Sequence, residues 1–333
     1  MQIFCNETSD IVDDSIKGFI KCHHRHVSHT ECPRTIKLKK APIAGKVGVV
    51  SGGGSGHAPA FMGYIGENML DAVAIGNIFT PPSSESFYNA FKAADSGNGV
   101  ICLYGNYIAD IESAQEAINR AANDGIIVKT VIANDDVATS DKNTRRGLTG
   151  EIFLWKIGGA AAALGYDLDG VVAVTEKAMQ NTRSIGVGLS SCIIPEVGRP
   201  NYIIEEGTME IGVGHHGFSS LDTCKLKSAD KTIDLMLDEI LKDMPQKKDN
   251  EIAIMMNGLG NTMLDELNIL YSRLDDVLKG MGVKTAHAYL GNFFTSLDMR
   301  GVTLTIMTLD SELKKLLEFP AYPVALNCFV QPE

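Results

Sequence analysis

The chain has 333 residues, of which 44% are hydrophobic, so it can bury the cores of one large or two ordinary domains. Its formal net charge of −11 argues against direct binding to nucleic acid, because phosphate contacts require a basic surface. The sequence shows no apolar run of membrane-spanning length and no signal peptide, so we expect a cytoplasmic protein without membrane contact. Seven scattered cysteines, an odd number, do not indicate a disulfide framework.

A helix and a histidine-rich segment come first. Residues 8–21 begin with capping side chains and continue with apolar residues at helical spacing, which predicts an amphipathic helix. The segment Cys22–Cys32 holds four histidines and two cysteines, a set typical of metal ligands. Their spacing matches no standard zinc pattern, so we expect an exposed segment and predict no metal and no other cofactor, with a structural metal at this segment as the less favoured alternative.

From residue 47 onward, short apolar runs alternate with helical patterns, which indicates parallel βα units. The strands expected in the first half are Val47–Val50, Ala72–Ile75, Val100–Leu103, Ile126–Ile132 and Ile185–Ser190. The helices expected there are Ile111–Ala122, Glu151–Leu164 and Leu168–Gln180. Proline and glycine residues near 192–201 indicate a break, so we predict an N-terminal domain of residues 1–191 and a C-terminal domain of residues 192–333.

The second half has the same alternation. Its expected strands are Met209–Gly214, Glu251–Met256, Lys284–Leu290 and Val302–Met307. Its expected helices are Ala229–Leu241, Met263–Lys279 and a short one near Ser311–Leu317, and a glycine turn is expected at Asn257–Asn261. The predicted fold class is therefore α/β, with two α/β domains that each contain a β-sheet flanked by helices.

A glycine-rich run follows the first of these strands and ends in a histidine, His57. Glycine lets a ligand approach the main chain closely, and a strand that leads into such a loop exposes backbone N–H groups at the carboxyl edge of a sheet. The run matches neither the dinucleotide pattern G-x-G-x-x-G nor the Walker A pattern. It predicts a small polar ligand, with a purely structural turn as the alternative.

Three residues that can carry chemistry, His57, Asp110 and His216, each follow the carboxyl end of an expected strand. In α/β proteins the active crevice lies there. A neutral imidazole can add to a ketone, and a His–Asp pair can bind hydroxyl groups and move protons. Their spacing fits neither a metal site nor a Ser-His-Asp triad. The pattern indicates a small polar ligand with acid–base chemistry, although each residue taken alone is more often structural.

Several further motifs accompany these residues. They are Gly63–Gly66, Met69–Ala72, Ile78–Thr80, Asn134–Ala138, Arg145–Gly147, Gly258–Gly260 and Thr295–Met299. Together with the glycine run they cover nearly the whole chain, which resembles the dihydroxyacetone-binding subunit (DhaK) family of bacterial dihydroxyacetone kinases. The resemblance implies a homodimer. Because the chain has no Walker A motif, we do not expect it to bind ATP by itself.

The resemblance also implies roles for individual residues. The glycine run, Gly54, Ser55 and Gly56, would bind the hydroxyl groups of dihydroxyacetone. His216 would form a covalent hemiaminal with the ketone carbon, while His57 and Asp110 would assist phosphoryl transfer. His215 falls on a position that is usually apolar in the family, so we do not expect it to be the nucleophile.

Three departures from the family lie around the expected ligand. A substrate-contacting lysine is replaced by Gly105, which we keep among the substrate-binding positions, and two glutamates are replaced by Ala58 and Phe218. Loss of a positive group beside a phosphoryl-transfer site can cost orders of magnitude in rate. We therefore expect a catalytically impaired member of the family.

Two functions remain open. The family includes a coactivator paralogue, DhaQ, that binds dihydroxyacetone and works with a TetR-type transcription factor, and its profile matches these departures. The leading interpretation is accordingly a dihydroxyacetone sensor and transcriptional coactivator. The alternative is the dihydroxyacetone-binding subunit of a phosphotransferase-dependent kinase, which would have a nucleotide-binding subunit and a phosphocarrier subunit as partners.

Overall fold

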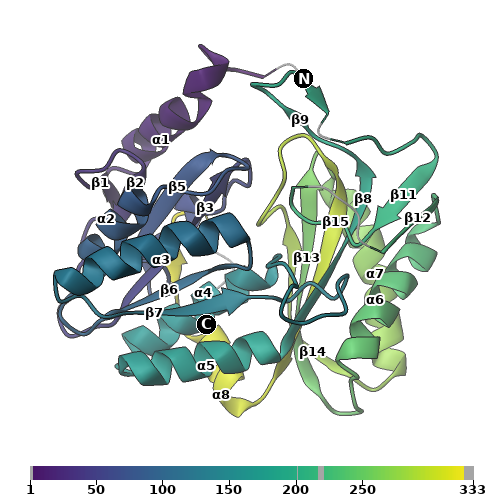
Figure 1. Cartoon of the computed structure of the whole chain (residues 1–333). Coiled ribbons are helices and arrows are strands. Elements are labelled where there is room, and N and C mark those ends of the chain that lie inside the picture. The colour runs from purple at the N-terminus through teal and green to yellow at the C-terminus, as the bar shows by residue number, and fades with distance from the viewer. Residues whose placement is uncertain (1–2, 201, 217–220, 326–333) are drawn as a thin grey trace. The chain divides into compact units, whose positions relative to one another are not determined.

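The computed structural model describes residues 3–200, 202–216 and 221–325 (Figure 1). The chain forms two compact units that alternate along the sequence. Among the described residues, 3–133, 151–178 and 313–325 make up the N-terminal unit, and those within 134–150 and 179–312 make up the C-terminal unit. Each unit contains a six-stranded sheet with helices, which confirms the predicted α/β fold class.

The sheet of the N-terminal unit has the strand order β1-β2-β5-β3-β6-β7. Its strands are β1 (Val27–His29), β2 (Thr35–Leu38), β3 (Gly48–Ser55), β5 (Ala72–Ile78), β6 (Val100–Gly105) and β7 (Val128–Ala133). The four strands from β5 to β7 are parallel, whereas β1 and β2 add antiparallel strands at one edge. The parallel βα units predicted for this part of the chain are confirmed.

Helices and short elements complete the N-terminal unit. They are η1 (Thr8–Asp10), α1 (Ile11–Cys22), η2 (Met62–Tyr64), α2 (Ser84–Ala94), α3 (Ile108–Asn123), α4 (Gly150–Ala163), α5 (Leu168–Gln180), α8 (Ser311–Glu318) and the strand pair β4 (Gly66–Glu67) with β16 (Tyr322–Pro323). In Figure 1, α2 and α3 lie side by side over one face of the sheet, and their buried side chains share a core cluster with those of β3, β5 and β6.

The helix α2 was not predicted from the sequence. Its N-cap, Ser83, accepts a hydrogen bond from the backbone N–H of Ser86.

The sheet of the C-terminal unit has the order β12-β11-β8-β15-β13-β14. Its strands are β8 (Thr182–Ser190), β11 (Thr208–Ile211), β12 (Asp222–Lys225), β13 (Glu251–Gly260), β14 (Lys284–Gly291) and β15 (Arg300–Leu309). Neighbouring strands are antiparallel except β13 and β14, which are parallel. The expected turn at Asn257–Asn261 is wrong in part, because β13 continues through Gly260 in its ladder with β15.

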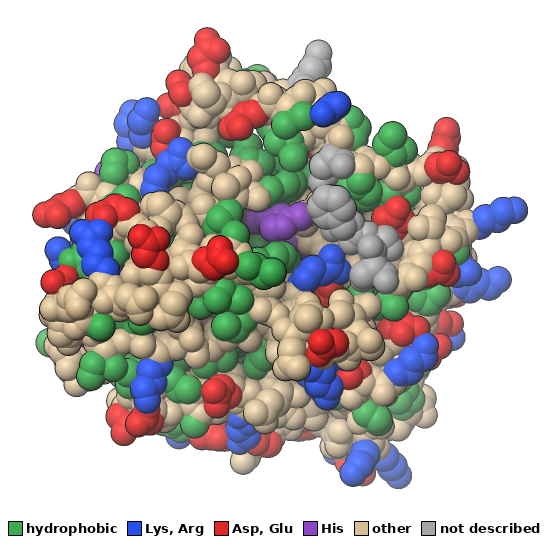
Figure 2. Space-filling model, viewed as in Figure 1, with side chains coloured by type: hydrophobic (Ala, Val, Ile, Leu, Met, Phe, Trp, Pro, Cys, Tyr) green, Lys and Arg blue, Asp and Glu red, His purple; other side chains and the backbone are tan. Residues whose placement is uncertain are grey.

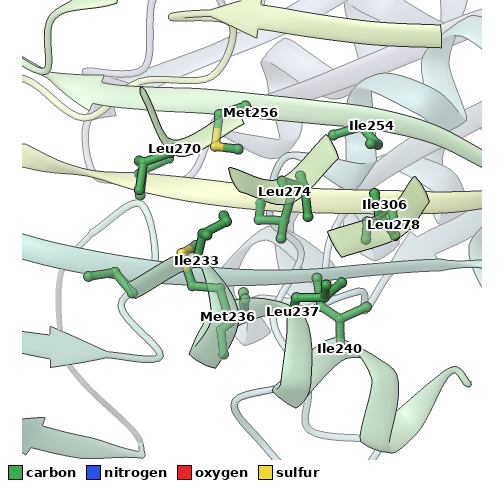
Figure 3. Packing of buried hydrophobic residues seen from close by; sticks show 14 of the residues in the cluster. Ile233, Met236, Leu237, Ile240, Ile254, Met256, Leu270, Leu274, Leu278 and Ile306 are labelled. Atoms are coloured by element: carbon green, nitrogen blue, oxygen red, sulfur yellow. The ribbon is translucent and has the colours of Figure 1, made fainter. Parts of the chain in front are cut away.

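The core of the C-terminal unit lies between this sheet and two amphipathic helices, α6 (Ala229–Asp243) and α7 (Leu264–Gly280) (Figure 3). Each helix contributes apolar residues at spacings of three and four, the pattern of a helix with one buried face. Figure 3 shows those of α6 and α7 pointing toward apolar side chains of β13 and β15. This packing fixes the sheet in which β11, the strand before the His216 turn, lies.

The division into units differs from the single boundary expected after residue 191. The strand β8, expected in the N-terminal domain, lies between β11 and β15 in the C-terminal sheet. The proline- and glycine-containing break contains a small antiparallel pair, β9 (Ile193–Ile194) and β10 (Arg199–Pro200). The proline and glycine residues there belong to a hairpin and not to a linker between domains. Both residue types are common in tight turns.

The described residues include no helix long and apolar enough to cross a bilayer. On the face drawn in Figure 2, Lys and Arg side chains are scattered among Asp and Glu side chains and form no single basic patch.

Candidate functional site

The glycine run continues the strand β3 further than the sequence suggested. Gly52, Gly53, Gly54 and Ser55 are strand residues, and a register shift against β5 falls between Gly53 and Ser55. The hydroxyl of Ser55 donates to the carbonyl of Gly76 over 2.8 Å. A Cβ atom at Gly54 would lie 2.9 Å from the backbone nitrogen of Thr80, so this position accepts no side chain without moving main chain.

The chain turns only at Gly56, whose φ of +102° is a conformation that favours glycine. The turn leads directly to His57, which is 2% exposed. Its ring stacks on that of Phe79, with ring centroids 5.2 Å apart and an interplanar angle of 21°. The orientation of the imidazole is therefore set by packing. The neighbouring Ala58 is exposed.

Asp110 lies in the first turn of α3, just beyond the end of β6. Its Oδ1 atom is buried and has no hydrogen-bond partner among the described residues. Burial raises the pKa of this carboxyl group to about 7. Because β3 and β6 are adjacent and parallel, their carboxyl ends meet at one edge of the sheet. The structure thus brings His57 and Asp110 to the same edge, as the sequence predicted.

The raised pKa of Asp110 leads to a prediction about stability. Between the ordinary value of 3.8 and about 7, the folded protein holds a proton that the unfolded chain has released, so this group's contribution to stability falls as pH rises through that window. We expect Asp110→Asn to stabilise the ligand-free protein at about pH 8, by on the order of 1 kcal/mol after allowance for solvent screening. At about pH 4 it should have little effect, because both forms are then neutral in the folded state.

Urea unfolding at the two pH values measures the difference. Glu112→Gln is the matched control, since Glu112 is an exposed carboxylate on the same helix and should give no pH-dependent gain. A loss of stability for Asp110→Asn at the higher pH, or an equal gain at both, contradicts the prediction.

A carboxylate occupies the space beside Gly105. Glu151, in the first turn of α4, is 3% exposed. A Cβ atom at Gly105 would lie 2.5 Å from its Oε1 atom and 3.1 Å from the ring of Tyr107. The expected lysine position is therefore bordered by a buried carboxyl group. Glu151 was not predicted from the sequence, because it is far from Gly105 in the chain and carries no motif of its own.

In the C-terminal unit, His215 and His216 follow β11 in a turn. Burial, and then the positive charge of Arg146, lower the pKa of His216 to about 4. The His216 imidazole is therefore neutral at neutral pH, which is the nucleophilic form. His215 is 2% exposed and its ring stacks on Phe294 at a centroid distance of 4.1 Å. Phe218, a predicted departure from the family, lies outside the described residues.

Arg146 is held in place beneath this turn. Its Nε atom donates to Oδ2 of the buried Asp136 over 2.8 Å, and its Nη2 atom donates to the carbonyl of Gly212 over 2.6 Å. A Cβ atom at Gly214 would lie 2.9 Å from Nη1 of Arg146. The Arg145–Gly147 and Asn134–Ala138 motifs thus meet below the histidine turn.

Three residues of the histidine-rich segment, Val27–His29, form the edge strand β1 of the N-terminal sheet, and most of its other residues are exposed, as expected. The rings of His23 and Phe19 have their centroids 4.7 Å apart, and Nδ1 of His24 is hydrogen-bonded to the carbonyl of Lys21. His29 belongs to β1. Within the described ranges, no three His, Cys, Asp or Glu side chains are grouped so that they could hold a metal ion.

A family model, the Dak1 domain, matches residues 17–325. The chain belongs to the Dak1 family. A Dak1 relative from Listeria innocua, the dihydroxyacetone-binding subunit DhaK of PTS-dependent dihydroxyacetone kinase 2, is 38% identical over 322 residues, which are 96% of this chain and 97% of the relative. The corresponding subunit of the PEP-dependent kinase of Escherichia coli is 32% identical and covers 98% of this chain and 99% of its own.

Solved Dak1 structures agree with the fold. The dihydroxyacetone kinase operon co-activator DhaQ superposes with a TM-score of 0.88 at 27% identity, over 94% of this chain and 97% of that chain. The dihydroxyacetone kinase of C. freundii gives a TM-score of 0.85 at 29% identity, over 97% of this chain and 60% of that longer chain. The resemblance to the DhaK family deduced from the motifs is confirmed. Both a kinase and a coactivator share the Dak1 fold of this chain.

Proposed function

We propose that this Dak1 protein binds dihydroxyacetone as a covalent hemiaminal at His216 and acts as a ligand-dependent coactivator of a TetR-type transcription factor that controls dihydroxyacetone kinase genes. The observation that carries the choice of a sensor is the environment of Gly105. No lysine is present there, and the buried carboxylate of Glu151 borders the position.

The covalent step uses the neutral form of His216. The lone pair of one ring nitrogen forms a bond to the ketone carbon, and the carbon–oxygen π bond breaks. The former carbonyl oxygen gains a proton, while the other ring nitrogen loses its proton, so that the product imidazole is neutral. A pKa of about 4 keeps this nucleophile unprotonated across the physiological range.

The remaining contacts belong to the N-terminal sheet edge. We assign to His57 and Asp110 the hydrogen bonds that orient one terminal hydroxyl of dihydroxyacetone. The unpartnered Oδ1 of Asp110 supports this assignment, since a buried polar atom without a partner is costly unless a ligand supplies one. The backbone N–H groups of Gly54, Ser55 and Gly56 would hold the ligand from the other side.

Phosphoryl transfer places different demands on a site. The migrating phosphoryl group is negatively charged, and enzymes stabilise it with Lys, Arg or Mg²⁺. A glycine at position 105, next to the carboxyl group of Glu151, supplies no such positive charge. A sensor needs only differential affinity of the ligand for two states, and turnover would consume its signal.

The second candidate is the dihydroxyacetone-binding subunit of a phosphotransferase-dependent kinase. It is favoured by the 38% identity with the Listeria innocua kinase subunit over nearly the whole of both chains. The two candidates share ligand and covalent chemistry. They differ in the fate of the bound ligand, which a kinase phosphorylates and a sensor leaves unchanged.

One experiment separates them. The purified protein is mixed with dihydroxyacetone and with nucleotide-loaded and phosphocarrier subunits from a competent kinase, and dihydroxyacetone phosphate is measured. We expect a rate at least about 100-fold below that of the matched kinase subunit, the size of effect seen when one charge-stabilising group is lost. A pull-down with a TetR-type regulator should recover more partner when ligand is present.

Gly105→Lys tests the same argument in reverse, because a lysine at this position should raise the rate of phosphorylation above that of the wild type. The obstacle to a side chain there is the end of the Glu151 side chain and the Tyr107 ring, which can shift, so the lysine can be accommodated beside Glu151. A wild-type phosphorylation rate comparable to that of a kinase subunit overturns the sensor proposal and supports the second candidate.

A further inference from the structure

A closed network of buried polar side chains lies behind the His215–His216 turn, entirely within the C-terminal unit. Oγ1 of Thr149 is 3.4 Å from Nε2 of His215 and 2.6 Å from Oγ1 of Thr303. Oγ1 of Thr303 in turn accepts from Nδ2 of Asn257 over 3.0 Å. Thr149, Thr303 and Asn257 are fully buried, so each lost hydrogen bond leaves a polar atom without access to water.

The same network holds the main chain on which His215 rests. Oδ1 of Asn257 accepts from the backbone N–H groups of Phe293 and Phe294 over 2.8 and 2.9 Å, and its Nδ2 donates to the carbonyl of Phe294 over 2.9 Å. The ring of Phe294 is the surface on which the His215 imidazole stacks. The ring of His215 is thus fixed both at its edge and on its face.

The carbonyl group of His215 is fixed as well. It accepts a hydrogen bond from the hydroxyl of the buried Ser296, two residues after Phe294. On the other side of the turn, the Arg146 guanidinium lies close beneath Gly214 and is itself bound to Asp136 and to the carbonyl of Gly212. The peptide that joins His215 to His216 is therefore held by Ser296, and the main chain just before it is held by Arg146.

We propose that His215 is a positioning residue, which through its contacts with Thr149, Phe294 and Ser296 sets the place and direction of the His216 imidazole for addition to a ketone. The proposal rests on the proposed function of His216. An apolar side chain of similar size at position 215 could stack on Phe294, but it could not engage the hydroxyl of Thr149. An adduct formed by a displaced imidazole would be strained, because the new bond requires the ring nitrogen and the ketone carbon to meet in one geometry, and that strain lowers the equilibrium for addition.

The test compares two valine substitutions on one strand. Thr303→Val removes the hydroxyl that joins Asn257 to Thr149. Thr305→Val removes a hydroxyl of the same type, bonded to Oγ of Ser184 over 2.7 Å and equally buried, from a position two residues along β15. Both should reduce the stability of the protein, Thr303→Val by more, because its hydroxyl takes part in two hydrogen bonds and that of Thr305 in one. We expect Thr303→Val, Thr149→Val and His215→Leu to lower the equilibrium for hemiaminal formation about 10-fold, and Thr305→Val to leave it unchanged.

Adduct formation is followed with dihydroxyacetone labelled with ¹³C at the carbonyl carbon, whose resonance moves from a ketone to a tetrahedral position. Thr149→Ser, unlike Thr149→Val, retains the hydroxyl and should show the wild-type equilibrium for hemiaminal formation. If Thr303→Val and Thr305→Val lower the equilibrium for hemiaminal formation equally, the network contributes only to stability and the proposal is wrong.

A second readout needs no ligand. The pKa of His216, about 4 in the folded protein, reports its distance from Arg146 and its burial, and it can be followed by NMR of the imidazole. If His215 positions the ring, the pKa of His216 should move toward its ordinary value of 6.5 in Thr303→Val and His215→Leu but not in Thr305→Val. An unchanged pKa in both of the former variants overturns the proposal. Absence of any adduct in the wild type, with these shifts present, would refute the proposed function and leave the positioning role standing.

Discussion

His216→Ala is expected to abolish the hemiaminal and to lower the affinity for dihydroxyacetone by at least about 100-fold, which corresponds to about 2.7 kcal/mol. A ligand this small makes few non-covalent contacts, and its hydroxyl groups lose hydrogen bonds to water on binding, so the covalent bond is the principal anchor. Calorimetry measures the affinity. A crystal of the unsubstituted protein soaked with dihydroxyacetone should show continuous density from a ring nitrogen of His216 to the ketone carbon.

His287→Ala provides a control, because His287 lies on β14 in the same unit and stacks on Tyr289. It should bind dihydroxyacetone as the wild type does. Density that joins the ligand to His215, or a non-bonded gap at His216, would refute the covalent assignment.

Asp71→Ala is expected to destabilise the protein by about 3–5 kcal/mol, because it leaves the charge of Lys46 buried and uncompensated. Nζ of Lys46 lies 2.5 Å from Oδ2 of Asp71, and both side chains are buried. The same Oδ2 accepts from the backbone N–H of Val49 over 2.8 Å. The pair joins the start of β3 to the residue before β5, and thereby supports β3, which carries the glycine run, and the strand beside it.

Urea unfolding at neutral pH measures this loss. The exposed pair of Lys40 and Glu67 is the matched control, and Glu67→Ala should cost less than about 1 kcal/mol because water screens such pairs. Burial raises the pKa of Asp71, and the charge of Lys46 opposes that rise. A loss for Asp71→Ala no larger than that for Glu67→Ala would show that the buried pair contributes little.

The periodic parts of the sequence predicted the structure well. The helix Leu168–Gln180 was predicted with its observed bounds, and the ends of α6 and α7 were within two residues. Where glycine was interpreted as a signal for turns, the prediction was less accurate. Gly52 and Gly53 lie within β3, and these strand positions require glycine because a side chain at Gly52 would collide with Ala74 and one at Gly53 with the Phe61 ring. Single-sequence patterns cannot distinguish a glycine needed for close packing from one needed for a turn.

The candidate site was predictable where topology alone decides it. His57 and Asp110 share a sheet edge because they follow adjacent parallel strands. The missing partner of the Asp110 carboxyl group and the place of Glu151 beside Gly105 depend on packing between distant segments. The contacts of His215 with Thr149 and Phe294 likewise join stretches far apart in the sequence.

The position of β8 has a consequence for any attempt to divide the chain. This strand precedes most of the C-terminal unit in the chain, yet it lies inside that unit's sheet, with β15 on one side and β11 on the other. A cut near residue 191 would leave β8 on the first fragment without either of its neighbours, and would expose the backbone groups of an interior strand. We therefore expect fragments that end or begin near residue 191 to need each other in order to fold.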